Sequence, residues 1–182
     1  MLKSSVWIKE KAVKERLIEP FVGSSVRDGV ISYGLGPFGY DIRLDHEYKK
    51  LISSKNGIDP HNISDNDYSC HSEKIIEMSP GSYILGKSFE YFKIPEKILG
   101  LVFGKSTYAR CGILVNVTPL EPGWEGYITL SISNISGNKV TIYPEQGIAQ
   151  VIFVESDSMP LYSYGDLKGK YNKQDGVTVP KI

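Results

Sequence analysis

The spacing of turn-forming residues constrains this fold more than any other property of the chain. From Pro20 to about Val154, short apolar or alternating runs are separated by Gly, Pro, Asn and Asp. Turn signals that recur roughly every 8–12 residues are typical of an antiparallel sandwich or barrel. A parallel α/β sheet would instead need long helical patterns between its strands. We therefore predict a mainly β fold.

Ten segments have the length and composition of strands. They are 30–33, 40–44, 49–52, 75–78, 83–88, 98–103, 114–117, 127–133, 139–142 and 149–154.

A short N-terminal helix is predicted before these strands. Ser4 or Ser5 can cap it, and the pattern extends to about Leu17. Val13 and Leu17 lie one turn apart and are expected on its inner face, and Pro20 ends it.

Two polar segments are not predicted to form regular structure. Residues 53–74 are rich in Asn, Asp and Ser and are expected to form an exposed excursion between strands. Residues 162–182 are rich in Gly and Lys and lack periodicity. We expect this tail to be loose, or ordered only by a ligand or a neighbouring subunit.

Composition limits the classes of function. The 182 residues fit a single domain, 1–182, and 21 basic residues balance 21 acidic ones. Without a basic field, a nucleic-acid or membrane-surface partner is not expected. No apolar run approaches the ~20 residues that cross a bilayer, and the N-terminus lacks a secretory hydrophobic segment. We therefore expect a cytoplasmic protein.

The metal-binding residues are few. Cys70 and Cys111 have no pattern that indicates a disulfide framework or a zinc site. Zinc-dependent deamination uses H-x-E followed by P-C-x-x-C, and the sequence contains no C-x-x-C. The three histidines, His46, His61 and His71, are expected in or near polar loops. Zinc is therefore not expected.

A Gly-Lys-Ser-Thr turn follows the predicted strand 98–103. A P-loop would need a glycine five residues before Gly104, and position 99 is Leu. The P-loop is rejected, but the chemistry of an anion site remains, because backbone N–H groups, two hydroxyls, Lys105 and Arg110 are grouped together. An ordinary β-turn with exposed cations explains the same residues equally well.

The predicted strand 127–133 alternates between isoleucine or leucine and hydroxyl-bearing residues. Its polar face, which includes Thr129 and Ser131, either is solvated or lines a pocket. Glu121 precedes this strand in Leu-Glu-Pro-Gly-Trp, where it is either a surface turn residue or a rigidly held carboxylate.

Four segments that span most of the chain resemble the trimeric dCTP deaminases, which share a fold with the trimeric dUTPases. They are SYGLGPFGYDIRL (32–44), FEYFKIP (89–95), GKSTYARCGILVNVTPLEPGWEGYITL (104–130) and GKYNKQDGVTVP (169–180).

The resemblance implies a distorted jelly-roll-like β barrel of the dUTPase type with a short N-terminal helix. It also implies a homotrimer with active sites at subunit interfaces, and a C-terminal lid, 162–182. The reaction implied is zinc-independent conversion of dCTP to dUTP and ammonia by an activated water, with Mg²⁺ bound through the triphosphate. Some relatives also cleave dUTP to dUMP and pyrophosphate.

The resemblance also implies roles for particular residues. By this resemblance the phosphates are bound by Lys105, Ser106 and Thr107, and Arg110 helps to organise the reaction centre. The pyrimidine is contacted by the backbone of Asn116, Val117 and Thr118, and Glu121 lies near the deoxyribose. The lid closes over the nucleotide through Tyr164, Lys170 and Gln174. Tyr40, Asp41 and Arg43 match the family but are expected to pair strands or form an interface, and Trp124 is expected to be a core or interface anchor.

One position departs from the family pattern. Deaminating relatives read T-L-E after the Pro-Gly-Trp turn, and this glutamate moves the proton of the attacking water, whereas this chain reads Thr129-Leu130-Ser131. A serine hydroxyl without a partner base is a poor proton acceptor near neutral pH. Serine here resembles the dUTPase branch, where the turn carboxylate activates water. Three functions therefore stay open: a dCTP deaminase, a dUTPase-like (or dCTP/dUTP) pyrophosphatase that uses Glu121, and a catalytically silent nucleotide-binding protein.

Overall fold

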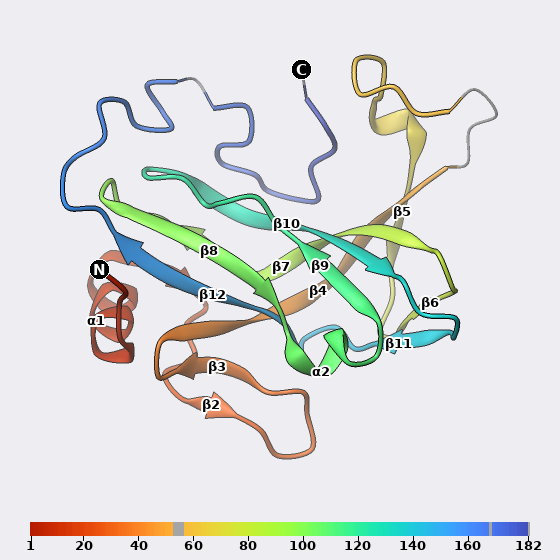
Figure 1. Cartoon of the computed structure of the whole chain (residues 1–182), viewed down its shortest axis with the longest axis horizontal. Coiled ribbons are helices and arrows are strands. Elements are labelled where there is room, and N and C mark those ends of the chain that lie inside the picture. The colour runs from red at the N-terminus through yellow and green to blue at the C-terminus, as the bar shows by residue number, and fades with distance from the viewer. Residues whose placement is uncertain (53–56, 168, 182) are drawn as a thin grey trace.

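The computed structural model describes residues 1–52, 57–167 and 169–181 (Figure 1). Its helices and strands are α1 (Ser5–Glu15), β1 (Ile18–Glu19), β2 (Ser25–Val26), β3 (Tyr33–Gly36), β4 (Gly39–Leu51), the 3₁₀ turn η1 (Asp65–Asp67), β5 (Tyr68–Ser72), β6 (Ile76–Met78), β7 (Tyr83–Lys93), β8 (Ile98–Gly104), α2 (Ser106–Ala109), β9 (Ile113–Asn116), β10 (Glu125–Asn134), β11 (Val140–Ile142) and β12 (Gly147–Glu155).

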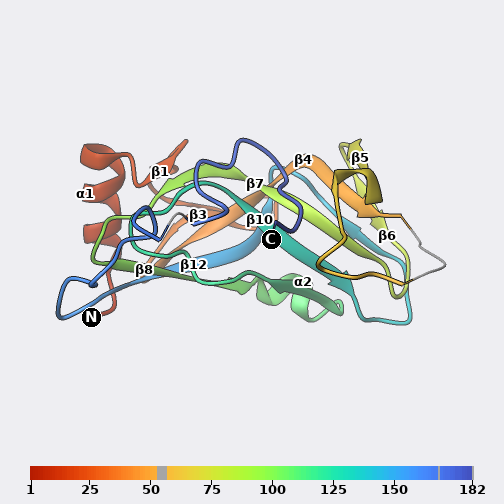
Figure 2. The same ribbon diagram turned by 90° about the horizontal axis from the view of Figure 1, so that it is seen from above.

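Most of the strands belong to one curled antiparallel sheet. Its main path runs β2-β3-β4-β7-β10-β9, and β12 joins β4 to β8. The short strands β1 and β5 pair with β7 and β4, while β6 and β11 form a separate pair. Figures 1 and 2 show the sheet curling into a half-barrel, with α1 packed at one end. The predicted mainly β fold with a short N-terminal helix is confirmed.

The core lies inside this curl and follows the alternation of the strands. On β10, Ile128, Leu130 and Ile132 are almost completely buried, as their spacing predicts. The residues between them are only half-buried and form the other face. No helix among the described residues is long and apolar enough to cross a membrane.

Several boundaries differ from the predicted ones. The predicted strands 40–44 and 49–52 are one strand, β4, whose pairing with β7 shifts register between Leu44 and Tyr48. The polar residues between Leu44 and Tyr48 therefore mark an irregularity within one strand and not the end of a strand. The first predicted strand, 30–33, is displaced to β3, because the glycine-rich sequence Tyr33–Gly36 has low β-propensity but pairs as a hairpin with β4.

The excursion predicted at 53–74 was partly wrong. It contains strand β5, which pairs with β4 along its whole length. The polar composition of β5 concealed it, since polar side chains are tolerated on a short edge strand. Residues 53–56 of this prediction lie outside the described residues.

The predicted inner face of the helix was also wrong at one position. Helix α1 ends at Glu15, and the next residue, Arg16, has a left-handed φ of 58°. Val13 is 71% exposed, whereas Ile8 and Ala12 are buried. Leu17 is buried as predicted, but it lies beyond the helix. The buried face of α1 is therefore shifted by one residue from the face that the sequence predicted.

Candidate active site

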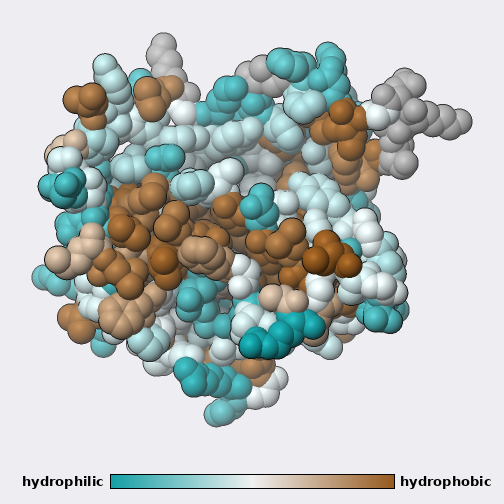
Figure 3. Space-filling view, viewed as in Figure 1, coloured by the Kyte–Doolittle hydropathy of each residue, from teal (hydrophilic) through white to brown (hydrophobic). Residues whose placement is uncertain are grey.

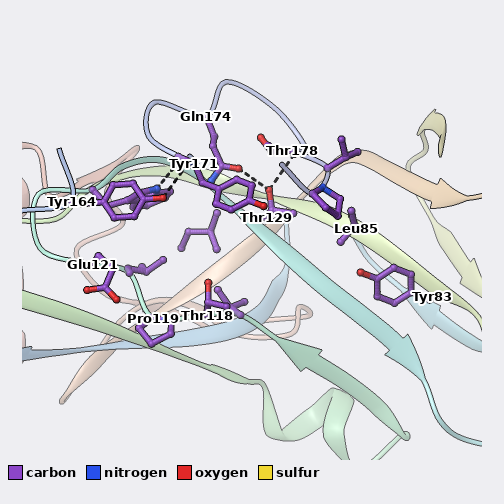
Figure 4. Close-up of a pocket in the computed structure, with 16 residues that line it drawn as sticks. Tyr83, Leu85, Thr118, Pro119, Glu121, Thr129, Tyr164, Tyr171, Gln174 and Thr178 are labelled. Carbon is purple, nitrogen blue, oxygen red and sulfur yellow. Dashed lines mark hydrogen bonds between the residues drawn. The ribbon is translucent and has the colours of Figure 1, made fainter. Parts of the chain in front are cut away.

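A pocket of about 450 Å³ lies between β10, the loop before it and the C-terminal tail (Figure 4). Apolar side chains predominate, with a few hydroxyl, amide and carboxylate groups, which is the usual composition of a small-molecule site. The lining residues are Tyr83, Leu85, Val117, Thr118, Pro119, Leu120, Glu121, Trp124, Ile128, Thr129, Tyr164, Tyr171, Gln174, Thr178, Val179 and Pro180.

The pocket lies beside the edge of β10 at which the hydrogen-bonding partner changes from β9 to the C-terminal tail. Strand β9 pairs with β10 residues 131–134. At the other end of β10, the tail forms a parallel bridge between Gln174 and Gly126. There the Tyr127 N–H donates to the Gln174 carbonyl oxygen at 3.0 Å, and the Lys173 N–H donates to the Glu125 carbonyl at 2.8 Å. Residues 128–130 lie between these two partners, and two of them, Ile128 and Thr129, line the pocket.

Thr129, the middle residue of 128–130, is hydrogen-bonded to the tail through its side chain. Its Oγ1 donates to Gln174 Oε1 at 3.2 Å and accepts the Thr178 N–H at 3.2 Å (Figure 4). The hydroxyl is therefore oriented by two groups of the tail, as the alternative of a pocket-lining polar face requires.

Trp124 provides a second anchor for the tail. Its Nε1–H donates to the Tyr171 carbonyl at 2.6 Å, and the Tyr171 N–H donates to the Tyr164 hydroxyl at 3.0 Å. Val177 and Val179 are buried in a small apolar cluster. The expectation that the tail is loose, or ordered only by a ligand or neighbour, is wrong for its described part, because it packs on its own chain. Residues 168 and 182 lie outside the described residues.

Five of the predicted substrate-site residues line this pocket. They are Val117, Thr118, Glu121, Tyr164 and Gln174.

Two other predicted residues lie outside the pocket lining. Lys170 is exposed, and its ammonium donates to the Lys181 carbonyl at 3.4 Å. Asn116 is exposed at the end of β9, directly opposite Ser131 on β10.

Ser131 lies at the margin of the pocket. It is one strand repeat beyond Thr129, on the same face, and its partner on β7 is Leu85, which lines the pocket. Among the described residues that line the pocket, Glu121 alone carries a carboxylate. Its turn is fixed by the Trp124 N–H, which donates to the Glu121 carbonyl at 3.0 Å.

The predicted anion-binding turn forms the short helix α2. Ser106, Thr107 and Arg110 are exposed there, and the Arg110 guanidinium donates to the Ser106 carbonyl at 3.1 Å. Lys105 is instead nearly buried against Asp41. None of these four predicted residues lines the pocket. Figure 1 shows α2 at the lower end of β8, with the tail along the opposite, upper side, so one chain does not bring the two groups together.

Sequence reasoning did not single out several lining residues, notably Tyr83, Leu85, Tyr171 and Thr178. One signal was available in the tail. Val177, Thr178 and Val179 alternate apolar, polar and apolar, and the structure buries both valines while Thr178 meets Thr129.

A buried ion pair lies elsewhere in the sheet. Glu90 is fully buried and accepts the Arg43 Nε–H at 2.7 Å, the Arg43 backbone N–H at 2.9 Å and the Tyr40 hydroxyl at 3.3 Å. Burial raises the pKa of the Glu90 carboxyl, and the Arg43 guanidinium opposes that rise. Burial likewise raises the pKa of the Tyr40 hydroxyl.

Two of the histidines lie in strands, which corrects the prediction of polar loops. His71 is in β5 and stacks on Tyr48. His46 is in β4, where Nε2 contacts the Glu145 carboxylate at 2.9 Å and Nδ1 contacts the Glu73 carbonyl at 3.0 Å. These two hydrogen bonds raise the pKa of His46. Among the described residues, no three His, Cys, Asp or Glu side chains are grouped to hold a metal ion.

The fold and pocket define a curled antiparallel β protein whose own C-terminal tail lines one side of a pocket. Residues 2–156 match the family model described as dCTP deaminase-like. The chain is 46% identical to a dCTP deaminase of Herpetosiphon aurantiacus over 182 residues, which cover 100% of this chain and 99% of the relative. It is 48% identical to a dCTP deaminase of Ehrlichia canis over 178 residues, which cover 97% and 95%. The chain belongs to the dCTP deaminase-like family.

A solved structure supports the fold independently. The 2'-deoxycytidine 5'-triphosphate deaminase from Agrobacterium tumefaciens superposes with a TM-score of 0.66 at 13% identity. The match covers 85% of this chain and 48% of that chain, so this chain accounts for about half of that protein's length.

Proposed function

We propose that this protein catalyses the hydrolysis of dCTP to dUTP and ammonia, as part of pyrimidine deoxynucleotide metabolism. The observation that carries the proposal is the identity of 46–48% to dCTP deaminases over nearly the entire chain. Since dCTP is an intracellular nucleotide, a cytoplasmic location is part of the proposal.

The pocket has the size and chemistry for the nucleoside part of this substrate. Its volume falls within the range of roughly 300–1,000 Å³ that small-molecule sites occupy. In our proposal the backbone of Asn116, Val117 and Thr118 contacts the pyrimidine. The tail residues Tyr164, Lys170 and Gln174 close over the nucleotide, which requires Lys170 to move from its present position.

The triphosphate needs cations that the pocket itself lacks. We propose a homotrimer in which Lys105, Ser106, Thr107 and Arg110 of a neighbouring copy meet the phosphates. The separation of α2 from the pocket within one chain supports this arrangement (Figure 1). An exposed apolar area over β8 and β9, visible in Figure 3, offers a surface for such contacts. Phe103 on β8 and Leu114 on β9 are each about half exposed.

We further propose that Mg²⁺ enters with the triphosphate and that zinc takes no part. The described side chains provide no metal cage, which fits an ion held mainly by substrate phosphates and water. When bound, Mg²⁺ neutralises phosphate charge.

Deamination requires a proton to be moved within the pocket. Water adds at C4 of the pyrimidine, the C4–N bond breaks, and the nitrogen leaves as ammonia. Of the two protons of the water, one leaves with the ammonia and the other ends on the ring nitrogen N3. Ser131 cannot take a proton from the water efficiently without a partner base. We propose that Glu121, the carboxylate that lines the pocket, carries the proton in this chain. Loss of a well-placed base costs roughly 10²–10⁴-fold in rate, so we expect slow turnover.

A second candidate function follows from the same two residues. If Glu121 orients water toward the phosphates and Ser131 takes no part, the reaction is pyrophosphate release from dUTP or dCTP. The serine at position 131 favours this alternative specifically.

Product analysis separates these functions. Purified protein is incubated with dCTP or dUTP and Mg²⁺, and ammonia, dUTP, dUMP and pyrophosphate are measured. Ammonia with intact triphosphate supports deamination, whereas pyrophosphate without ammonia supports the second candidate. Tight nucleotide binding without either product would refute both and leave the silent nucleotide-binding protein.

Three variants assign the proton carrier. Ser131→Glu is expected to raise ammonia release by about 10²-fold or more, because it places a base at the pocket margin. Cys70→Glu, at an exposed strand position on β5 that lies opposite Lys49 and outside the pocket lining, is the control and is expected to leave the rate unchanged. Glu121→Gln should remove the remaining activity. An unchanged rate in Ser131→Glu would show that this position is not where the proton is moved.

A further inference from the structure

The ammonium of Lys105 is held by a carboxylate from another part of the sheet. Lys105 Nζ lies 2.6 Å from Asp41 Oδ2, and the two side chains are only 11% and 14% exposed. An ion pair shielded to this degree is screened less by salt than a surface pair. The position of the Lys105 ammonium is therefore set by where Asp41 is placed.

Asp41 is fixed by three strands. It lies on β4, opposite Gly34 of β3 on one side and Gln150 of β12 on the other. The Gln150 side-chain amide donates to Asp41 Oδ1 at 3.1 Å, so each carboxylate oxygen has a partner. Asp41 is therefore held both by backbone pairing and through its side chain.

The stem of Lys105 is fixed as well. Its backbone N–H donates to the Ile148 carbonyl at 3.0 Å. The side chain packs against Gly147, where an added Cβ would lie 3.1 Å from Lys105 Cδ and 2.0 Å from the Ser32 carbonyl oxygen. Glycine at this position therefore leaves room for the lysine stem.

We infer that Asp41 is a positioning residue that fixes the Lys105 ammonium for the phosphates of the nucleotide. An ammonium group has three N–H donors, so a bond to one carboxylate oxygen leaves two for an anion. A lysine that is already localised loses less side-chain entropy when the anion binds. The inference rests on the proposed phosphate role of Lys105, and it assigns Asp41 more than the strand-pairing role expected from sequence.

The test compares the binding of dCTP and dCMP by titration calorimetry in the presence of Mg²⁺. The ratio of the two affinities isolates contacts with the outer phosphates, because general damage to the fold weakens both ligands. Asp41→Asn is expected to lower the dCTP affinity about tenfold and to leave dCMP binding nearly unchanged, with KM rising more than kcat falls. Asp45→Asn, a carboxylate on the same strand that lies 3.6 Å from Lys87, is the matched control.

A double-variant cycle shows whether Asp41 acts through Lys105. In a Lys105→Gln background, Asp41→Asn should have no further effect on the affinity ratio. An equal loss in both backgrounds would overturn the inference, and so would a gain in dCTP affinity on Asp41→Asn, which would mean that Asp41 restrains Lys105 from the phosphates. If Lys105→Gln itself leaves the ratio unchanged, the proposed phosphate role of Lys105 fails, and the positioning role fails with it.

A milder variant covers the case in which Asp41→Asn does not fold. Gln150→Met removes the amide that orients the carboxylate but keeps the ion pair. It is expected to change the affinity ratio in the same direction by about twofold to threefold, and no change in this ratio would count against the inference.

Discussion

The buried pair between Arg43 and Glu90 gives a stability prediction with a characteristic dependence on pH. In Arg43→Met, the guanidinium that lies 4.1 Å from the Phe89 ring and 4.9 Å from the Tyr33 ring is replaced by an apolar side chain. Glu90 remains fully buried and keeps the Tyr40 hydroxyl and the backbone N–H of residue 43 as hydrogen-bond donors.

The expected loss is large. Removal of one partner from a buried ion pair costs about 3–5 kcal/mol, compared with total stabilities of about 5–15 kcal/mol. For a chain of this length each kcal/mol corresponds to about 2–4 °C, so the melting temperature should fall by about 6–20 °C. Lys139→Met is the control, because Lys139 and Glu77 form a surface pair at 2.7 Å with both side chains 57% exposed. It is expected to cost less than about 1 kcal/mol.

The sign of the pH effect follows from Glu90. Burial raises its pKa, and loss of the opposing Arg43 guanidinium raises the pKa further. A carboxyl whose pKa is higher in the folded than in the unfolded protein destabilises the fold when it is ionised, and that cost is relieved as the pH falls through the folded pKa. The deficit of Arg43→Met should therefore be largest near pH 8 and should shrink toward pH 5.

Urea denaturation of wild type, Arg43→Met and Lys139→Met at pH 8 and pH 5 measures this difference. An equal deficit of Arg43→Met at both pH values would refute the electrostatic argument. It would assign the role of Arg43 to packing between the two aromatic rings.

Three further predictions concern the tail and the sheet. Gly126→Ala should detach the tail, because Gly126 has a φ of 149° and an added Cβ would lie 2.8 Å from the tail backbone. Limited proteolysis of this variant should then cleave first within 162–181, and a cleavage pattern identical to that of the wild type would contradict the prediction. Trp124→Phe removes the indole N–H that binds a tail carbonyl and should cost about 1 kcal/mol in urea denaturation, so an unaltered midpoint would argue against that bond. Hydrogen bonds to Glu145 and the Glu73 carbonyl raise the pKa of His46, so its stabilisation is complete below the unfolded value of about 6.5 and is lost as pH rises through the folded pKa. His46→Gln should therefore lower the melting temperature at pH 6 but not at pH 9, and a loss at both would exclude protonation as the cause.

The alternation of apolar and polar residues predicted the strands of the central sheet, because one face of each strand is buried. The pattern of Ile128, Leu130 and Ile132 identified β10, and the structure confirms both its faces. Strand β5 escaped prediction because it is polar and depends on β4 for its hydrogen bonds. The phase of α1 was misjudged at Val13, since the choice between neighbouring helical stripes is made by the sheet that packs against them.

The candidate site was predictable in its parts but not in its arrangement. Thr118, Glu121 and Gln174 were recognised from motifs, and they do converge on one pocket. The partner of Lys105 was not predictable, because Asp41 is far away in sequence and meets it only through strand register. Which side chains meet across neighbouring strands of a curled sheet is a property of the tertiary structure.

The shared edge of β10 has a consequence for how this pocket could be resized. Strand β9 and the tail each take up part of one row of backbone groups, and the three residues 128–130 between them leave an interval of roughly 10–13 Å at about 3.3 Å per residue. The length of the β10 edge that stays unpaired therefore changes in steps of one residue when either partner is lengthened or shortened. An extension of β9 by two residues would pair Val117 and Thr118 with Leu130 and Thr129, which would shorten the unpaired interval by roughly 7 Å and re-orient two residues that line the pocket.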